Sequence, residues 1–243
     1  MHLDDAFATP QAKRQYVRRL FATIADRYDL ITAVLSYGQD ARWKARLVSL
    51  ANVQPGDRAL DLACGTGDIA FGVAAKGART IGIDITHRML QLARRRAASA
   101  GASSTQAVDF VTGDMTCLPL PAASFDLVTT GYGLRNVPDL DAAIDEIARV
   151  LRPGGRLVSL DFNRPESGPV RAAYLAYLTV VGSALGWVLH RDPDTYRYIP
   201  ASIRRYPGAR GVADRLRARG FAGARVVPLL FGLMTLHIAE RSH

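Results

Sequence analysis

The chain has 243 residues, of which 49% are hydrophobic and 22% charged, and it carries a formal net charge of +9. These values exclude intrinsic disorder and are typical of one globular domain with a packed core. The positive charge is almost entirely arginine and is scattered, without a nucleic-acid motif, so we predict no nucleic-acid partner. An anionic membrane surface remains an open alternative.

The cysteines Cys64 and Cys117 lack the spacing of a metal site or a redox motif. We therefore predict no metal, no disulfide and a cytoplasmic location, with the inner face of the membrane as an alternative. Residues 1–19 carry charges throughout and hold no apolar stretch, which excludes a signal peptide as their interpretation.

Residues 1–52 are expected to form an N-terminal helical lid. Thr9 followed by Pro10 is typical of a helix start, and a basic helix is predicted to continue to about Arg27. A second stretch has helical spacing at Trp43, Leu47, Leu50 and Ala51.

Residues 53–162 alternate short apolar runs with helical stretches. Alternating strands and helices predict right-handed βαβ units and a mostly parallel sheet. The expected strands are 59–63, 80–83, 110–111, 127–130 and 157–160, and the expected helices are 69–76, 89–100 and 140–151.

Residues 163–207 contain an apolar run from Ala173 to Leu189. A membrane-spanning helix needs about 20 apolar residues, and this run is shorter and contains Gly182 and Gly186. We predict a buried or substrate-facing helix, with a membrane span as the alternative. Residues 208–243 predict a helix and an antiparallel hairpin of strands 224–230 and 233–239, so the whole chain is expected to form a single domain.

A glycine loop follows the first predicted strand, from Asp61 to Asp68. Gly65 and Gly67 allow a tight turn and a close approach of the backbone to a ligand. Asp84, at the end of the second strand, can accept hydrogen bonds from both hydroxyls of a ribose. This pair of features indicates an adenosine cofactor but also fits the dinucleotide fingerprint, so it leaves the choice of cofactor open.

Motifs after the third, fourth and fifth strands narrow that choice. Asp114 and Met115 offer a carboxylate for an adenine amino group and an apolar side chain for the ring face. With the glycine loop, Asp84 and the motifs Leu118-Pro119, Phe125-Asp126 and Leu151-Arg152-Pro153-Gly154-Gly155, the series resembles class I methyltransferases. Ala63 stands where the loop usually has its first glycine.

Gly133-Leu134-Arg135-Asn136-Val137 makes the resemblance more specific. Together with the motifs at 28–29, 43–44, 194–198, 202–203 and 206–207, the chain resembles the ubiquinone/menaquinone biosynthesis C-methyltransferase family from about Leu20 to His237. The resemblance implies an α/β Rossmann-like fold with a mostly parallel seven-stranded sheet and an antiparallel C-terminal strand. It also implies S-adenosylmethionine as the cofactor, and methylation of a ring carbon on a prenylated quinol. The expected cofactor-binding residues are Asp61, Ala63, Gly65, Thr66, Gly67, Asp84, Ile85, Asp114, Met115 and Gly131.

The chain departs from this family pattern in its substrate-facing half. Ile31-Thr32-Ala33 replaces M-N-D, and Asp40-Ala41 stands in place of H-R before Trp43-Lys44. Ala201 replaces the acid of E-S-I, and residues 228–232 replace N-L-T-x-G. These changes leave another phenolic, polyketide-like or lipid acceptor, methylated at oxygen or nitrogen, as an alternative.

Methylation of an aromatic carbon requires an ionised neighbouring hydroxyl, which places negative charge on that carbon. Arg135 is predicted to stabilise the phenolate as a permanent cation, Asn136 to orient the ring or cofactor, and Asp161 is a candidate base. His190 is expected to cap a helix and His237 to pack in the core. The expected acceptor-binding residues are Tyr28, Tyr132, Tyr174, Leu178, Tyr196 and Tyr198, with Val181 and Leu185 on the same helix face.

An isoprenoid tail on the acceptor would need the apolar helix as a groove or membrane-facing lid. Peripheral membrane association is therefore expected, and a homodimer is left open. Two alternatives to a methyltransferase belong to other functional classes. They are an NAD-binding oxidoreductase and a non-catalytic protein that binds an adenosine ligand.

Overall fold

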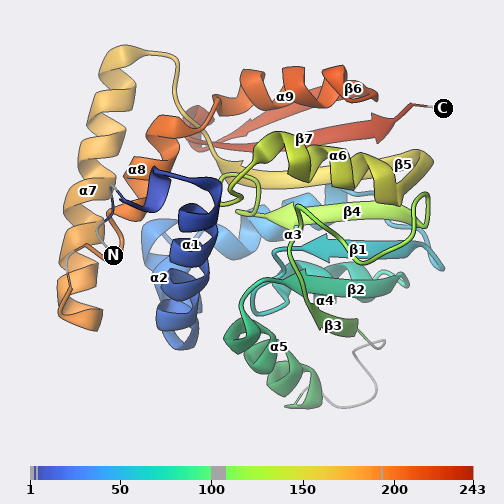
Figure 1. Ribbon diagram of the computed structural model, residues 1–243, viewed down its shortest axis with the longest axis horizontal. Helices are drawn as coiled ribbons and strands as arrows, with labels where there is room; N and C mark the ends of the chain where they lie inside the picture. The colour runs from blue at the N-terminus through green and yellow to red at the C-terminus, as the bar shows by residue number, and fades with distance from the viewer. Residues whose placement is uncertain (1–2, 4, 100–107, 193, 243) are drawn as a thin grey trace.

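The alternation of apolar runs and helical stretches folds into one seven-stranded sheet in the order β3-β2-β1-β4-β5-β7-β6 (Figure 1). The computed structural model describes residues 3, 5–99, 108–192 and 194–242. The strands are β1 (Arg58–Leu62), β2 (Arg79–Asp84), β3 (Val108–Thr112), β4 (Phe125–Gly131), β5 (Leu151–Phe162), β6 (Phe221–Leu229) and β7 (Met234–Arg241).

Strands β1 to β5 are parallel, whereas β7 is antiparallel to both of its neighbours, β5 and β6. The mostly parallel sheet and the antiparallel C-terminal hairpin are therefore confirmed. The strand order reverses between β1 and β4, and ligands of open α/β sheets bind at this switch point, outside the carboxyl ends of the strands.

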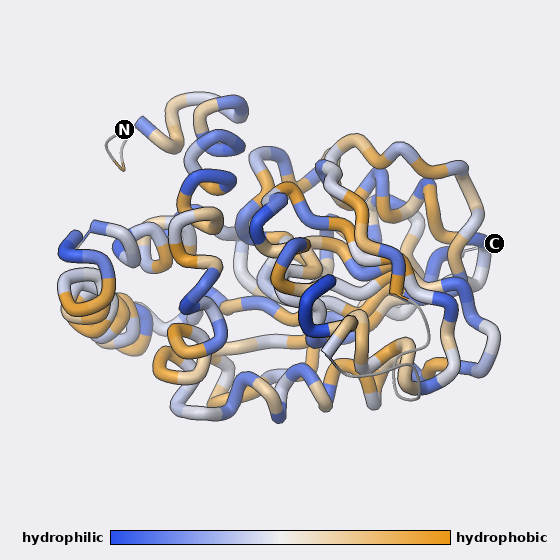
Figure 2. The backbone as a smooth tube through the Cα atoms, turned by 90° about the horizontal axis from the view of Figure 1, so that it is seen from below, coloured by the Kyte–Doolittle hydropathy of each residue, from blue (hydrophilic) through white to orange (hydrophobic). Residues whose placement is uncertain are grey.

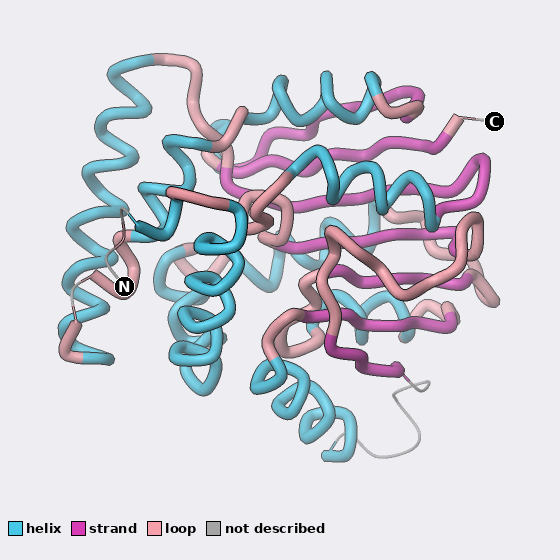
Figure 3. The backbone as a smooth tube through the Cα atoms, in the orientation of Figure 1, coloured by secondary structure: helices cyan, strands magenta, loops and turns pink. Residues whose placement is uncertain are grey.

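Helices cover both faces of the sheet and its carboxyl-end edge (Figures 1 and 3). Core residues of α6 and α9 pack on one face, and those of α3 and α4 pack on the other. The helices are α1 (Pro10–Ile24), α2 (Tyr28–Leu35), α3 (Asp40–Leu50), α4 (Asp68–Ala74), α5 (His87–Ser99), α6 (Leu140–Val150), α7 (Gly168–His190), α8 (Tyr198–Arg205) and α9 (Gly208–Ala218), with short 3-10 turns at Asp5–Phe7, Ala25–Arg27 and Leu230–Gly232.

The N-terminal helices form as the sequence predicts. The Thr9 hydroxyl accepts a hydrogen bond from the Ala12 amide at 3.1 Å, which caps α1, and Pro10 is its first residue. The basic helix ends at Ile24, three residues before the predicted end at Arg27, because a 3-10 turn intervenes. The predicted end of α5 at Ala100 lies outside the described residues.

Helix α7 is longer and less buried than predicted. It is the one helix in the described part of the chain that is long and apolar enough to cross a membrane by length and composition. One face packs inward through Tyr174, Leu178 and Gly182, but Val180 and Trp187 are 69% and 67% exposed. The prediction of a buried helix therefore holds for one face of α7 only.

Candidate active site

A small cavity lies at the carboxyl ends of β1, β2 and β4, with a volume of about 80 Å³. Seven of the residues predicted to bind a cofactor line it: Ala63, Gly65, Asp84, Ile85, Asp114, Met115 and Gly131. These residues come from separate stretches of chain that meet because parallel strands end at the same edge of the sheet.

Asp84 ties the glycine loop to the end of β2. Its Oδ2 accepts a hydrogen bond from the Gly65 amide at 2.9 Å, and its Oδ1 accepts one from the Thr86 amide at 2.7 Å. Burial raises the pKa of Asp84, and these backbone donors oppose the rise. The carboxylate is therefore held in a fixed orientation at the cavity wall.

The loop between β1 and α4 needs an unusual backbone. Gly67 has a φ of 92° and caps α4, and Ala63 has a φ of 53° although it is not a glycine. A Cβ on Gly133 would lie 2.3 Å from Thr130 Oγ1 and 3.0 Å from Ala63 Cβ. The G-L-R-N-V loop can therefore approach the cofactor loop this closely only with glycine at 133.

Three residues predicted to bind the cofactor lie outside the cavity lining. Asp61 is 1% exposed and its Oδ1 accepts a hydrogen bond from the Thr129 hydroxyl at 2.7 Å, beneath the loop. Thr66 donates to Asp29 Oδ1 at 3.1 Å, and Gly67 begins α4. All three residues belong to the glycine loop, and the contacts that they make support the loop itself.

Helix α1 contributes residues that the sequence analysis missed. Arg14, Val17 and Phe21 line this small cavity, and Arg14 Nε lies 2.7 Å from Asp114 Oδ2. No local pattern could reveal this pair, because its members are a hundred residues apart and only the packing of α1 joins them.

A second, larger cavity of about 400 Å³ adjoins the first. Its lining is mostly apolar and comes from α1, α2, α7, α8 and the ends of β5 and β7. Phe21, Tyr28, Tyr132 and Asn136 line both cavities. A ligand in one cavity would therefore be separated from a ligand in the other by these side chains alone.

Five of the six residues predicted to bind an acceptor line the larger cavity: Tyr28, Tyr132, Tyr174, Tyr196 and Tyr198. Leu178 does not; it packs with Leu175 and Ile203 behind the wall. Val181 and Leu185 likewise pack against Ile24 and Ile31, on the inner side of the N-terminal helices. The apolar face of α7 therefore supports the cavity more than it lines it.

Arg135 lines the larger cavity and is fixed from several sides. Its amide donates to Asp161 Oδ2 at 2.9 Å, its Nε lies 3.3 Å from Asp161 Oδ1, and its Nη1 donates to the Ser202 hydroxyl. The guanidinium lies over the Phe162 ring, 5.0 Å from its centroid. The cation therefore has one orientation at the cavity wall.

Asp161 lines neither cavity and is 1% exposed. Burial raises its pKa, and the Arg135 guanidinium opposes the rise. Its oxygens accept hydrogen bonds from Arg135 and the Phe162 amide, so they hold Arg135 in place, and the role of Asp161 as a base stays a prediction.

Asn136 lines both cavities and has one buried side-chain atom without a partner in the described part of the chain. Its Nδ2 donates to the Tyr132 carbonyl at 2.7 Å, whereas its buried Oδ1 has no partner among the described residues.

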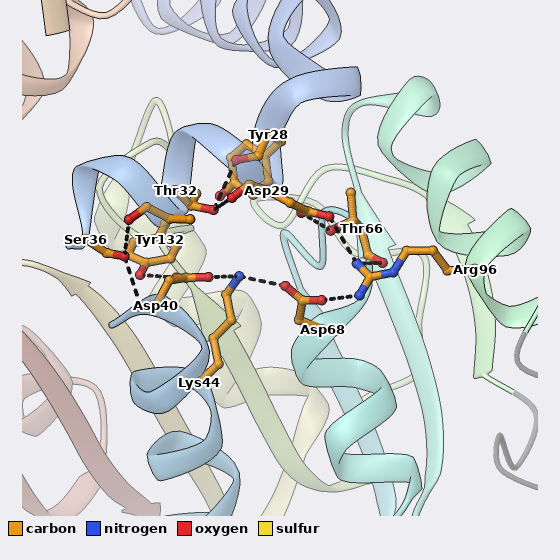
Figure 4. A network of polar contacts seen from close by, with 11 residues as sticks. Tyr28, Asp29, Thr32, Ser36, Asp40, Lys44, Thr66, Asp68, Arg96 and Tyr132 are labelled. Atoms are coloured by element: carbon orange, nitrogen blue, oxygen red, sulfur yellow. Dashed lines mark hydrogen bonds and ion pairs between the residues drawn. The ribbon is translucent and has the colours of Figure 1, made fainter. Parts of the chain in front are cut away.

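Tyr132 is held in a left-handed conformation, with a φ of 62°, at the end of β4. Its hydroxyl donates to Asp40 Oδ1 at 2.6 Å, and Asp40 pairs with Lys44 at 2.6 Å (Figure 4). Asp40 and Lys44 belong to sequence motifs, but nothing in the local pattern connects them to Tyr132.

The two candidate histidines have structural partners. His237 is 1% exposed and its Nε2 lies 3.0 Å from the Ala209 carbonyl oxygen. His190 ends α7, and its Nε2 lies 2.9 Å from the Tyr196 hydroxyl. Among the described residues, no three His, Cys, Asp or Glu side chains come together to hold a metal ion.

Solved structures place this fold among class I methyltransferases. An S-adenosylmethionine-dependent methyltransferase from Thermotoga maritima matches with a TM-score of 0.67 at 20% identity, over 93% of this chain and 100% of that one. Phosphoethanolamine N-methyltransferase 2 from Haemonchus contortus matches with a TM-score of 0.61 at 15% identity, over 83% of this chain and 53% of that one. At these identities the likeness defines the fold.

Sequence relatives define the family. The model of the ubiE/COQ5 methyltransferase family matches residues 9–241. The chain is 39% identical over 224 residues to the demethylmenaquinone methyltransferase of Thermus thermophilus, covering 91% of this chain and 100% of that protein. It is 36% identical over 230 residues to the ubiquinone/menaquinone biosynthesis C-methyltransferase UbiE of Rubrivivax gelatinosus, covering 95% and 88%. The chain therefore belongs to the ubiE/COQ5 methyltransferase family, and it is an S-adenosylmethionine-dependent methyltransferase.

Proposed function

We propose that this enzyme methylates a ring carbon of a prenylated quinol in menaquinone or ubiquinone biosynthesis. The observation that carries the proposal is the pair of adjoining cavities, one walled by glycines with the carboxylates of Asp84 and Asp114 and the other mostly apolar with Arg135 in its wall. The names of the relatives in Thermus thermophilus and Rubrivivax gelatinosus support the same acceptor class.

The residues that line the smaller cavity suit S-adenosylmethionine, which supplies an electrophilic methyl group on a sulfonium. At about 80 Å³ the cavity must widen to admit the whole cofactor. Asp84 would accept hydrogen bonds from the ribose hydroxyls, while Asp114 and Met115 would meet the adenine. Gly65 and Gly131 leave room for the backbone to approach the ligand. For Asp114 to bind adenine, its oxygen must be shared with or released by Arg14.

In the larger cavity, Arg135 would stabilise the phenolate, since its guanidinium keeps its charge and is held in place by Asp161 and Ser202. Asn136 Oδ1 would accept a hydrogen bond from the hydroxyl of the acceptor or from the cofactor. We propose that residues 1–52 and 163–207 act as lids, because α1, α2, α7 and α8 enclose this space over the sheet edge (Figure 1).

Transfer of labelled methyl to a panel of quinols and phenols, with mass analysis of the methylated position, tests this function. We expect a ring-methylated product from a naphthoquinol or benzoquinol. Methylation at oxygen or nitrogen, or no transfer to any quinol, would reject the proposed acceptor. Calorimetry should detect S-adenosylmethionine binding and no NAD(H) binding, which separates the enzyme from a dinucleotide oxidoreductase.

We further propose peripheral membrane association through the exposed face of α7. Val180, Trp187 and Val188 are each at least 67% exposed on this helix. Figure 2 shows that much of the length of α7 is hydrophobic. Val170 and Tyr37 are exposed as well and line the larger cavity, so the cavity opens beside this apolar surface. Arg171 and Arg191 flank the apolar stretch, and the net charge of +9 favours anionic lipid. An isoprenoid tail could pass from lipid to cavity along this face.

Sedimentation with phosphatidylglycerol vesicles tests the membrane proposal. The double variant Val180→Glu/Trp187→Glu should lose vesicle binding and keep its activity on a tail-free quinol. Val111→Glu is the control, since Val111 is 42% exposed on β3, away from α7. Unchanged vesicle binding by the double variant, or a concentration-dependent dimer that this variant disrupts, would reject lipid as the occupant of the face.

A further inference from the structure

A chain of polar side chains leads from the wall of both cavities to the protein surface (Figure 4). It begins at Tyr132, whose hydroxyl donates to Asp40 Oδ1 at 2.6 Å. Lys44 Nζ lies 2.6 Å from Asp40 Oδ2 and 2.8 Å from Asp68 Oδ2, and Arg96 Nη2 lies 2.7 Å from Asp68 Oδ1. The side chains of Asp68 and Arg96 are 28% and 44% exposed, so the chain ends in solvent.

This arrangement is costly if its purpose is packing alone. Asp40 and Lys44 are 8% and 9% exposed, and burial of an ion pair costs several kcal/mol in desolvation, which its attraction repays only with good geometry. The left-handed conformation of Tyr132 adds about 1–3 kcal/mol of strain. A phenylalanine at position 132 with an apolar residue at position 40 would fill the same space without a buried hydroxyl and carboxylate, which indicates that this pair has a function.

Methylation of a ring carbon has a proton balance that the cavity must satisfy. The ring loses a hydrogen and gains a methyl group, the sulfonium becomes a neutral thioether, and one proton is released per turnover. Arg135 stays protonated, and Asp161 is bound to Arg135 outside the cavity lining. Tyr132 lines both cavities, so an acceptor placed beside the cofactor would contact its side chain.

We propose that Tyr132 is a catalytic residue that relays the proton of the acceptor hydroxyl to Asp40, and that Lys44 positions Asp40 as a carboxylate for this step. The acceptor proton passes to Tyr132 Oη while the proton of Tyr132 passes to Asp40 Oδ1. The electron pair of the broken O–H bond stays on the acceptor oxygen, which becomes the phenolate that Arg135 stabilises. After the ring carbon has taken the methyl group and the neutral thioether has left, the C–H proton of that carbon moves to the acceptor oxygen and restores the aromatic quinol. The proton on Asp40 is then the one released to solvent in each turnover. This inference rests on the proposed function, because a phenolic hydroxyl must be present to give up the proton.

The charges around Asp40 fit this role. Burial acts to lower the pKa of Lys44, but Tyr28, Asp40 and Asp68 outweigh it and raise the pKa above its ordinary value, so Lys44 remains a cation. Burial and Asp40 raise the pKa of Tyr132, so the tyrosine is protonated between turnovers and transfers its proton only as it receives another.

Tyr132→Phe and Asp40→Asn test the relay in the full-length enzyme, with a quinol that the wild type methylates. Both variants keep the shape of the side chain. We expect each to lower kcat by about 10²–10⁴-fold, with KM and the S-adenosylmethionine Kd unchanged, and the double variant to be no slower than the singles. The solvent deuterium isotope effect on kcat should disappear, and formate should restore part of the rate to Asp40→Ala.

Tyr206→Phe is the matched control and should retain the wild-type kcat, because Tyr206 is buried in the core and lines neither cavity. Wild-type kcat in Tyr132→Phe, or additive losses in the double variant, would overturn the relay while leaving the proposed function intact. Loss of the isotope effect in Tyr196→Phe instead would move the proton path to His190. Failure of the wild type to methylate any quinol would reject the proposed function and this inference together.

Discussion

Asp61 gives the folded protein a pH dependence that a single substitution should remove. The residue is 1% exposed at the end of β1, where its Oδ1 accepts one hydrogen bond, from Thr129, and its Oδ2 has no partner among the described residues. Burial raises the pKa of this carboxyl to about 7, despite the opposing hydrogen bond from Thr129. Asp61→Asn keeps the shape of the side chain and removes the titration.

The direction in which the free energy of unfolding changes with pH follows from the number of protons bound by the folded and by the unfolded protein. Between about pH 4 and pH 7 the folded protein holds a proton on Asp61 that the unfolded chain has released, so the free energy of unfolding falls as the pH rises. Each pKa unit corresponds to about 1.4 kcal/mol. Between pH 5 and pH 8 the wild type should therefore lose about 3 kcal/mol of stability relative to Asp61→Asn.

Urea unfolding at pH 5, 6, 7 and 8, followed by the fluorescence of Trp43 and Trp187, measures this difference. Asp109→Asn is the control, since it removes a carboxylate at an exposed position of β3. A difference between the wild type and Asp61→Asn that stays constant across this range would show that Asp61 is ionised in the folded protein at pH 5, and would refute the reasoning.

Two further predictions concern the cofactor loop and the G-L-R-N-V loop. Asp84→Asn should weaken S-adenosylmethionine binding by at least about 100-fold, as measured by calorimetry. A hydrogen bond to a charged group contributes about 1.5–3 kcal/mol, and two ribose hydroxyls are involved. An unchanged Kd would show that Asp84 does not bind the cofactor. Lys13 Nζ donates to the backbone carbonyls of Arg135 and Val137, and burial, assisted by Arg135, lowers the pKa of Lys13 to about 8. The ammonium charge is lost as the pH rises through 8, so kcat should decline above that pH in the wild type, and a pH–rate profile of Lys13→Met should lack this decline.

The cofactor half of the site followed from sequence because its geometry is repetitive. A residue at the carboxyl end of a parallel strand lies at the sheet edge whatever the rest of the chain does, and Asp84, Asp114 and Gly131 occupy such ends. A motif does not specify the direction of each side chain, however. Asp61 and Thr66 lie in the same loop, yet Asp61 faces Thr129 below it and Thr66 faces Asp29 of α2.

The remaining site residues depend on how helices pack over that edge. Arg14 pairs with Asp114 because α1 lies across the smaller cavity. Asp40 accepts a hydrogen bond from Tyr132 because α3 begins beside the end of β4. Sequence separations of about 90 to 100 residues carry no periodic signal that could predict such pairs. The apolar run of α7 was equally ambiguous, since a helix that is apolar all round can be buried, half-exposed or membrane-bound.

The departures from the family pattern acquire a physical meaning from this packing. Asp40 stands where the family usually has a histidine, and it is the residue that accepts the hydrogen bond of Tyr132 and pairs with Lys44. A change at that position therefore alters the group bound to Tyr132, which lines both cavities, while the cofactor loop departs from the pattern only at Ala63. Ala201 is buried on α8, beside the Ser202 that binds Arg135, so the second departure also lies next to the cation that would stabilise the acceptor. Under the proposed roles of Tyr132 and Arg135, both changes would act on how the acceptor proton and charge are handled, and neither would act on the binding of the methyl donor.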